Sequence, residues 1–194
     1  MIYLVRHGET EWNRAGRMQG QLDSPLTERG QAQARAVGET LAELTSGGDG
    51  LGMVASPLGR TMATAAFIAE ALGAKDIATD ARLMEMSWGD WDGLTHPEIE
   101  ARSPGELARR EAGRWDHLPP GGESYAITAL RVASFIADVD PEQPLIVVSH
   151  GGTGRVIRGL YGQLSQDEML TLEQPQDAFH RLYQGQIGRI DSGA

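Results

Sequence analysis

Three short apolar runs constrain the fold of this chain more than any other feature of its sequence. They comprise residues 2–5, 53–55 and 145–148, and each ends in polar or charged residues. Runs of this length are typical of strands buried on both faces of a sheet. Residues with helical spacing follow the runs: Ala34, Val37, Leu41 and Leu44, then Ala63, Phe67, Ala71 and Leu72, then Val156, Ile157, Leu160 and Tyr161. Strands alternating with helices predict an α/β fold, a three-layer sandwich in which helices cover both faces of a mostly parallel sheet.

The length of 194 residues predicts a single domain over residues 1–194. Residues 80–125 interrupt the alternation, because short helical stretches there surround several tryptophans and a Pro-Pro-Gly-Gly segment. We interpret this stretch as a lid-like insertion, since such irregular segments commonly cover binding sites. Trp88, Trp91 and Trp115 are expected to pack beneath it instead of stacking on a substrate.

The net charge of −10 argues against binding to nucleic acid over a broad surface, since that affinity comes from many Lys and Arg residues. With no cysteine, the chain offers no disulfide, thiol nucleophile or Cys-based zinc site. The apolar start at residues 1–5 is too short for a signal peptide, and no apolar run reaches membrane-spanning length. We therefore expect a soluble, cytoplasmic protein without a nucleic-acid or membrane partner, and we leave a homodimer open.

Polar residues follow each apolar run at the point where the predicted strand ends. Arg6 and His7 follow the first run, and His150 and Gly151 follow the third. Ser56 follows the second run, and with Pro57 it is expected to cap a helix that carries Arg60. In parallel sheets the binding crevice lies beyond the carboxyl ends of the strands. If these strands are neighbours, two Arg and two His meet there and favour a compact dianion such as the phosphate of a small phosphorylated substrate.

This set of side chains is suited to phosphoryl transfer without a metal or a cofactor. A neutral imidazole can attack phosphorus directly, so His7 is the candidate nucleophile, with its second nitrogen tied to a backbone carbonyl. Arg6, Arg60 and His150 would hold the equatorial oxygens. Glu85, flanked by apolar residues that favour its protonated form, is the candidate general acid and base. The rival carboxylates are Glu9, Glu28 and Glu123.

Several motifs in order resemble those of the histidine phosphatase superfamily over essentially the whole chain. They are Arg6-His7-Gly8-Glu9, Asn13, Gln19-Gly20, Pro25-Leu26-Thr27 with Gly30-Gln31, the set Ser56, Arg60 and Thr64, and His150-Gly151. The resemblance implies that His7 is the nucleophile and Glu85 the acid and base. It also implies phosphate ligands: Arg6, Asn13, Gln19, Arg60, His150 and the Gly151 amide.

Within this family the segment after Glu85 favours the phosphatase branch, because it lacks the His-Tyr-Gly-like continuation of the mutases. A phosphoglycerate-mutase-type phosphotransferase and a catalytically silent phosphate-binding protein stay as alternatives. Arg109, Arg110 and Arg114 alternate with acidic residues, which predicts a charged helix face, with a clamp for a second phosphate as the alternative.

Overall fold

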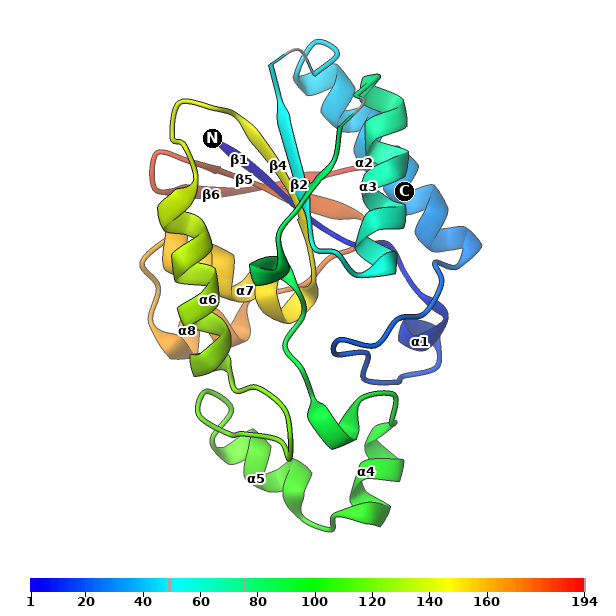
Figure 1. Cartoon of the computed structure of the whole chain (residues 1–194), viewed down its shortest axis with the longest axis vertical. Coiled ribbons are helices and arrows are strands. Elements are labelled where there is room, and N and C mark those ends of the chain that lie inside the picture. The colour runs from blue at the N-terminus through cyan, green and yellow to red at the C-terminus, as the bar shows by residue number, and fades with distance from the viewer. Residues whose placement is uncertain (49, 75, 194) are drawn as a thin grey trace.

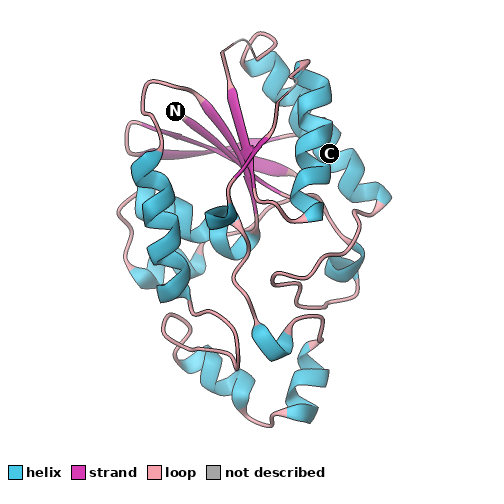
Figure 2. Ribbon diagram, in the orientation of Figure 1, coloured by secondary structure: helices cyan, strands magenta, loops and turns pink. Residues whose placement is uncertain are grey.

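The structure is a computed structural model that describes residues 1–48, 50–74 and 76–193. The described residues form a six-stranded sheet with the strand order β3-β2-β4-β1-β5-β6, which Figure 2 shows between layers of helices. Strands β1 to β4 run parallel to one another, whereas β5 is antiparallel to both β1 and β6. The prediction of a mostly parallel sheet is therefore confirmed. The strands are β1 (Ile2–Arg6), β2 (Gly52–Ala55), β3 (Ala78–Thr79), β4 (Leu145–Ser149), β5 (Ala178–Tyr183) and β6 (Gln186–Asp191).

Helices cover both faces of this sheet, as Figure 1 shows. One face packs on α2 (Glu28–Leu44) and α3 (Gly59–Leu72), and the other on α6 (Tyr125–Asp138) and α7 (Gly151–Tyr161). The short helix α8 (Gln166–Thr171) packs against α7. Each face of the sheet has its own hydrophobic core. Alternate residues of β1 pack in the two cores, because successive side chains of a strand point to opposite faces. The three-layer sandwich is confirmed.

The first residues of two helices illustrate how local chemistry sets the helix boundaries. Thr27 caps α2 as its residue type predicts, since its Oγ1 accepts a hydrogen bond from the Gly30 N–H at 3.0 Å. The predicted cap at Ser56 is wrong, because α3 begins only at Gly59 and has no side-chain cap. The Ser56 N–H still continues the sheet by donating to the Val148 carbonyl at 3.0 Å, so the chain must turn before the helix can start.

Residues 80–125 form a group of short helices beyond the carboxyl ends of the parallel strands, coloured green in Figure 1. They include the 3-10 turns η1 (Ala81–Leu83) and η2 (Gly89–Trp91), and the helices α4 (His96–Arg102) and α5 (Glu106–Ala112). The loop after α1 (Glu11–Arg14) is joined to this group by Arg17, whose Nη1 donates to Glu98 at 2.8 Å and to the Gly93 carbonyl at 2.6 Å. Two tryptophans pack as expected: Trp91 stacks on His117, and Trp115 stacks on Tyr125.

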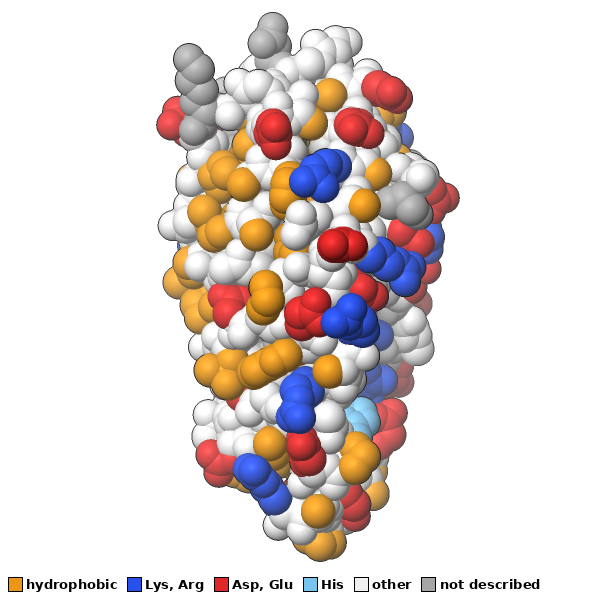
Figure 3. Space-filling view, turned by 90° about the vertical axis from the view of Figure 1, so that its right-hand side faces the viewer, with side chains coloured by type: hydrophobic (Ala, Val, Ile, Leu, Met, Phe, Trp, Pro, Cys, Tyr) orange, Lys and Arg blue, Asp and Glu red, His pale blue; other side chains and the backbone are white. Residues whose placement is uncertain are grey.

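The surface carries charges of both signs. Figure 3 shows the face that corresponds to the right-hand side of Figure 1, where acidic and basic side chains are interspersed. In residues 1–48, 50–74 and 76–193, no helix combines the length and the apolar character needed to cross a membrane.

Candidate active site

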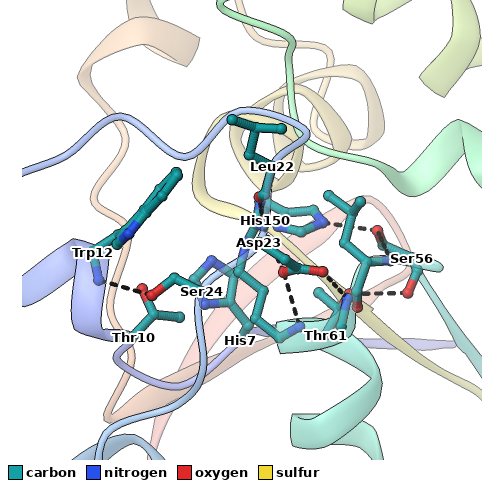
Figure 4. Close-up of polar contacts among 12 residues, drawn as sticks. His7, Thr10, Trp12, Leu22, Asp23, Ser24, Ser56, Thr61 and His150 are labelled. Carbon is teal, nitrogen blue, oxygen red and sulfur yellow. Dashed lines mark hydrogen bonds and ion pairs between the residues drawn. The ribbon is translucent and has the colours of Figure 1, made fainter. Parts of the chain in front are cut away.

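The sheet order brings the predicted site residues together at one edge. Strand β4 lies between β1 and β2 and pairs in parallel with both, so the residues that follow these three strands converge. The ring centroids of His7 and His150 are 5.3 Å apart, and Figure 4 shows the two imidazoles at neighbouring strand ends. The prediction that two Arg and two His meet at this edge is confirmed.

His7 is buried and held in one orientation. Its Nδ1 lies 2.8 Å from the Gly8 carbonyl oxygen, so Nδ1 donates its hydrogen there and Nε2 keeps its lone pair. The predicted backbone carbonyl is therefore that of Gly8. Burial lowers the pKa of His7 well below its ordinary value, and the charges of Arg6 and Arg60 lower it further. The imidazole is thus neutral near pH 7, the form that can attack phosphorus.

Gly8 is required by the close approach of two backbone segments beside His7. A Cβ at this position would lie 2.2 Å from the Gly30 carbonyl oxygen, which belongs to the backbone of α2 and cannot move aside. The Gly8 N–H donates to Thr64 Oγ1 at 3.1 Å, which ties the loop after β1 to α3.

Arg60 is fully buried and fixed by oxygen atoms of the loop that precedes α2. Its Nη1 donates to the Leu22 carbonyl at 2.6 Å and to Asp23 Oδ1 at 3.0 Å, and its Nη2 donates to the Gly20 carbonyl at 2.7 Å. Arg6 is fixed by the Gln174 carbonyl. Burial lowers the pKa of Arg6 to about 10, so it stays protonated at neutral pH.

His150 follows β4 and precedes the first turn of α7. Its Nε2 lies 2.8 Å from Ser56 Oγ, the contact drawn in Figure 4. Burial lowers its pKa well below the ordinary value, with the charge of Arg60 as the next cause, so this imidazole is also neutral. The Ser56 hydroxyl therefore contacts His150 and does not cap α3.

Three buried nitrogens in this cluster have no hydrogen-bond partner within the described part of the chain. They are Arg6 Nε, Arg60 Nε and His150 Nδ1. Buried polar groups without partners are rare in native proteins, and each calls for an explanation. Since all three belong to residues around His7, they indicate a binding site for an anion.

A cavity of about 220 Å³ lies at this edge of the sheet. The predicted residues among its lining are Arg6, His7, Asn13, Gln19, Arg60 and Glu85. Its other lining residues are Arg17, Met18, Gly20, Trp88, Arg110, Tyr125, Gly152, Arg155 and Gln174. His150 and Gly151 line a smaller adjacent cavity of about 20 Å³, which also contacts Arg6.

Asn13 and Gln19 reach the cavity from the loops around α1. Asn13 Oδ1 accepts hydrogen bonds from the Thr10 N–H at 3.2 Å and from Gln176 Nε2 at 3.1 Å, which leaves its amide NH₂ available to a ligand. Gln19 is buried, and its Oε1 has no partner among the described residues.

Glu85 lies in a polar environment that its apolar neighbours in the sequence did not indicate. Its Oε2 accepts from the Gly152 N–H at 3.0 Å, and its Oε1 accepts from the N–H groups of Thr153 at 3.0 Å and Met86 at 2.9 Å. Leu83 and Met86 are buried in the core on the α6 and α7 side of the sheet. The first turn of α7, where unpaired N–H groups favour negative charge, therefore holds this carboxylate.

The rival carboxylates lie elsewhere. Glu9 accepts a hydrogen bond from Thr27, Glu123 pairs with Arg131, and Glu28 is exposed in the first turn of α2. Among the described residues, Glu85 is the acidic residue that lines the cavity with His7. Across the same residues, no group of three or more His, Asp or Glu is arranged to hold a metal ion.

Sequence reasoning missed several side chains of the cavity. Arg155 lies four residues after Gly151, which places both on one face of α7, and this spacing could have identified it. Trp88 was expected to pack beneath residues 80–125, but it lines the cavity as well as contacting the core. Tyr125 and Gln174 carry no comparable signal, because their approach to the site depends on how α6 and the segment before β5 pack.

The three arginines of the predicted charged helix face have different environments. Arg109 is exposed and pairs with Glu106, as such a face predicts. Arg114 lies 3.8 Å from Glu111, whereas Arg110 lines the cavity.

Comparison with known proteins agrees with this geometry. Residues 2–186 match the family described as the histidine phosphatase superfamily (branch 1). Glucosyl-3-phosphoglycerate phosphatase from Mycobacterium tuberculosis (strain CDC 1551 / Oshkosh) is 39% identical over 163 residues, which cover 78% of this chain and 70% of the relative. The protein named probable phosphoglycerate mutase GpmB from Salmonella paratyphi C is 40% identical over 154 residues, which cover 77% and 69%.

Among solved structures, mycobacterial glucosyl-3-phosphoglycerate phosphatase in complex with VO3 is similar to this chain, with a TM-score of 0.77 and 34% identity. The alignment covers 93% of this chain and 92% of that one. The chain therefore belongs to the histidine phosphatase superfamily, within which it is a phosphatase of small phosphomonoesters.

Proposed function

We propose that the protein transfers the phosphoryl group of a small phosphomonoester first to His7 and then to water. The observation that carries this proposal is the state of His7: a buried neutral imidazole with Nδ1 bonded to the Gly8 carbonyl and Nε2 free. It lies among cationic side chains that retain unused buried donors. Attack by Nε2 forms the N–P bond while the bond from phosphorus to the leaving oxygen breaks.

The phosphate is proposed to bind where the unpartnered nitrogens of Arg6, Arg60 and His150 lie. The Gly151 N–H at the start of α7 and the amides of Asn13 and Gln19 would complete the site, because helix N-termini and amide groups donate to anions. His150 can donate through Nδ1 only if Nε2 accepts. Ser56 therefore donates its hydroxyl hydrogen to Nε2 and fixes the tautomer.

Glu85 is proposed to act on the leaving oxygen. In its protonated form it gives its proton to that oxygen, and the carboxylate then takes a proton from the water that attacks the phosphohistidine. That second step breaks the N–P bond, releases phosphate and restores neutral His7. The hydrogen bonds that its two oxygens accept from the first turn of α7 hold the Glu85 carboxyl group beside the cavity.

The substrate is proposed to be a small phosphorylated metabolite. Because a relative is named for glucosyl-3-phosphoglycerate, that compound and 3-phosphoglycerate are the first to test. A relative named as a mutase makes transfer from a bisphosphate donor the second assay, although the sequence after Glu85 favours hydrolysis. A cytoplasmic location is proposed for this reaction, and the cysteine-free composition is compatible with it.

The test is to trap the intermediate. Brief incubation with a ³²P-labelled substrate should label the protein at His7, through a bond that acid hydrolyses and alkali does not. His7→Ala should lose both the label and the turnover. A label that survives acid, or one that persists in His7→Ala, would assign the reaction to another nucleophile.

A further inference from the structure

Arg158, on α7, is a buried cation that the proposed reaction does not use. The residue is only 4% exposed. Burial lowers its pKa to about 10, so it stays protonated at neutral pH. Across the described residues no carboxylate forms an ion pair with it, and Glu173, whose charge raises this pKa, pairs with Arg189 at 2.6 Å. Because a buried charge without an ion-pair partner is costly, Arg158 calls for an explanation.

Two acceptors fix the guanidinium of Arg158 behind the sheet edge. Its Nη1 lies 3.0 Å from His180 Nε2, and its Nη2 donates to the Glu173 carbonyl. A guanidinium only donates, so His180 Nε2 accepts and the imidazole hydrogen lies on Nδ1. His180 is buried on β5, opposite Leu4 of β1, and burial lowers its pKa to about 4. The imidazole is therefore neutral near pH 7, as an acceptor for arginine must be.

Glu173 belongs to the segment of residues 172–176, which joins α8 to β5. Three successive carbonyls of this segment each accept a hydrogen bond from a different arginine. The bonds run from Arg155 to the Leu172 carbonyl, from Arg158 to the Glu173 carbonyl and from Arg6 to the Gln174 carbonyl. Arg158 therefore fixes the backbone directly beside the carbonyl that orients Arg6.

The 172–176 segment also contacts other parts of the proposed phosphate site. Gln176 Nε2 donates to the His7 carbonyl and to Asn13 Oδ1, both at 3.1 Å. A Cβ at Gly151 would lie 2.5 Å from Gln174 Oε1, so the segment packs closely against the first residue of α7. A shift of this segment would disturb several groups of the phosphate site together.

Arg158 is separated from the phosphate site by the smaller cavity of about 20 Å³. Arg6, His150 and Gln174 line this cavity on the side of the site, and Arg158 and His180 also line it. A space of this size has room for about one water molecule but not for a phosphate group. Arg158 therefore acts on a bound phosphate through its neighbours and not by contact.

We propose that Arg158 and His180 are positioning residues, which hold the 172–176 segment so that Arg6 is directed at the phosphate. This inference rests on the proposed function, because Arg6 is positioned for the phosphate of that reaction. His180 and the Glu173 carbonyl fix the planar guanidinium of Arg158 at two points. The adjoining Gln174 carbonyl then holds Arg6 Nη1, which leaves Arg6 Nε for the anion.

The test is a double-mutant cycle on the binding of orthovanadate, measured by isothermal titration calorimetry. Arg158→Met should weaken binding by about tenfold, as expected when a charge-assisted hydrogen bond from Arg6 is misdirected. In protein that already carries Arg6→Met, the same substitution should weaken binding by less than about twofold, because no Arg6 is left to position. A long-range effect of the Arg158 charge, or a general loss of packing, would weaken binding equally in both backgrounds.

Arg189→Met is the matched control, since Arg189 also binds Glu173 but through its half-exposed carboxylate. It should keep the wild-type affinity for vanadate. His180→Met should weaken binding as Arg158→Met does, whereas His180→Gln, which keeps an oxygen that can accept from Arg158, should retain most of the affinity. If Arg158→Met fails to fold, His180→Met, which leaves the charge in place, is combined with Arg6→Met in the same cycle.

Vanadate affinities of Arg158→Met and His180→Met within about twofold of the wild-type value would overturn the proposal. So would equal losses with and without Arg6. Either result leaves vanadate binding and phosphate release by the wild-type protein intact. Failure of the proposed function would instead appear in the wild-type protein itself, which would bind no vanadate and release no phosphate even from p-nitrophenyl phosphate.

Discussion

The assignment of Glu85 as the proton donor predicts that Glu85→Gln slows the reaction by an amount that depends on the leaving group. An alkoxide leaves poorly without a proton, whereas p-nitrophenolate is a weak base and leaves with little help. The substitution should therefore slow phosphorylation of His7 by glycerol 3-phosphate by about 10² to 10⁴, the usual contribution of general acid catalysis. The corresponding step with p-nitrophenyl phosphate should slow far less.

The structure indicates how large the effect common to both substrates should be. Glutamine can still accept hydrogen bonds at the position of Oε1, from Met86 and Thr153, but its NH₂ group faces the Gly152 N–H where Oε2 accepted. Loss of one such hydrogen bond costs about 1 kcal/mol, or roughly a factor of 5 in rate if the whole cost falls on the transition state. If Glu85→Gln slows phosphorylation by glycerol 3-phosphate much more than phosphorylation by p-nitrophenyl phosphate, and the ratio of the two effects is well above that factor, the excess is due to loss of the donated proton.

Single-turnover measurements of phosphoenzyme formation are required, because Glu85 is also proposed to assist hydrolysis of the phosphohistidine and can limit the steady state with every substrate. Glu28→Gln, at an exposed carboxylate outside the cavity, is the control and should match the wild-type protein. If Glu85→Gln slowed phosphorylation equally with both substrates, Glu85 would position the site without donating a proton.

Three further predictions follow from the site and its surroundings. Phosphate release should be unchanged by EDTA, since Arg and His supply the positive charge, while vanadate in its trigonal-bipyramidal form should inhibit; activity lost to EDTA and recovered with a divalent ion would contradict this mechanism. Ser56→Ala should lower kcat/KM by about tenfold, because His150 loses the contact that fixes its tautomer, and Ser56→Thr, which keeps the hydroxyl, should retain more activity. Burial lowers the pKa of His180 from 6.5 to about 4, so its contribution to stability is present above pH 6.5 and is lost as the pH falls towards 4. His180→Gln should reduce the slope of the unfolding free energy against pH by up to about 1.4 kcal/mol per unit in urea titrations between pH 6 and 4.5, and an unchanged slope would refute this account.

The elements that position His7 could be predicted because their signals are local. The apolar runs at residues 2–5 and 145–148 encode strands by length and composition alone, and Thr27 encodes a helix start by its side chain. The prediction that Ser56 caps a helix was wrong because a serine hydroxyl can either cap a helix or hydrogen-bond to a histidine ring. Only the pairing of β2 with β4, which places Ser56 beside His150, decides between those roles.

The two ends of the cavity also differ in how far the sequence predicts them. The centre of the phosphate end is built from Arg6, His7 and His150, which lie at or directly after the ends of parallel strands, so strand order brings them together. The other end is built from Trp88, Arg110 and Tyr125, whose approach depends on the irregular path of residues 80–125 and on packing against α6. Phosphate chemistry is common to all substrates of such a site, whereas recognition of the leaving group must distinguish one substrate from another. The part of the site that resists prediction from local pattern is therefore the part in which specificity has to lie.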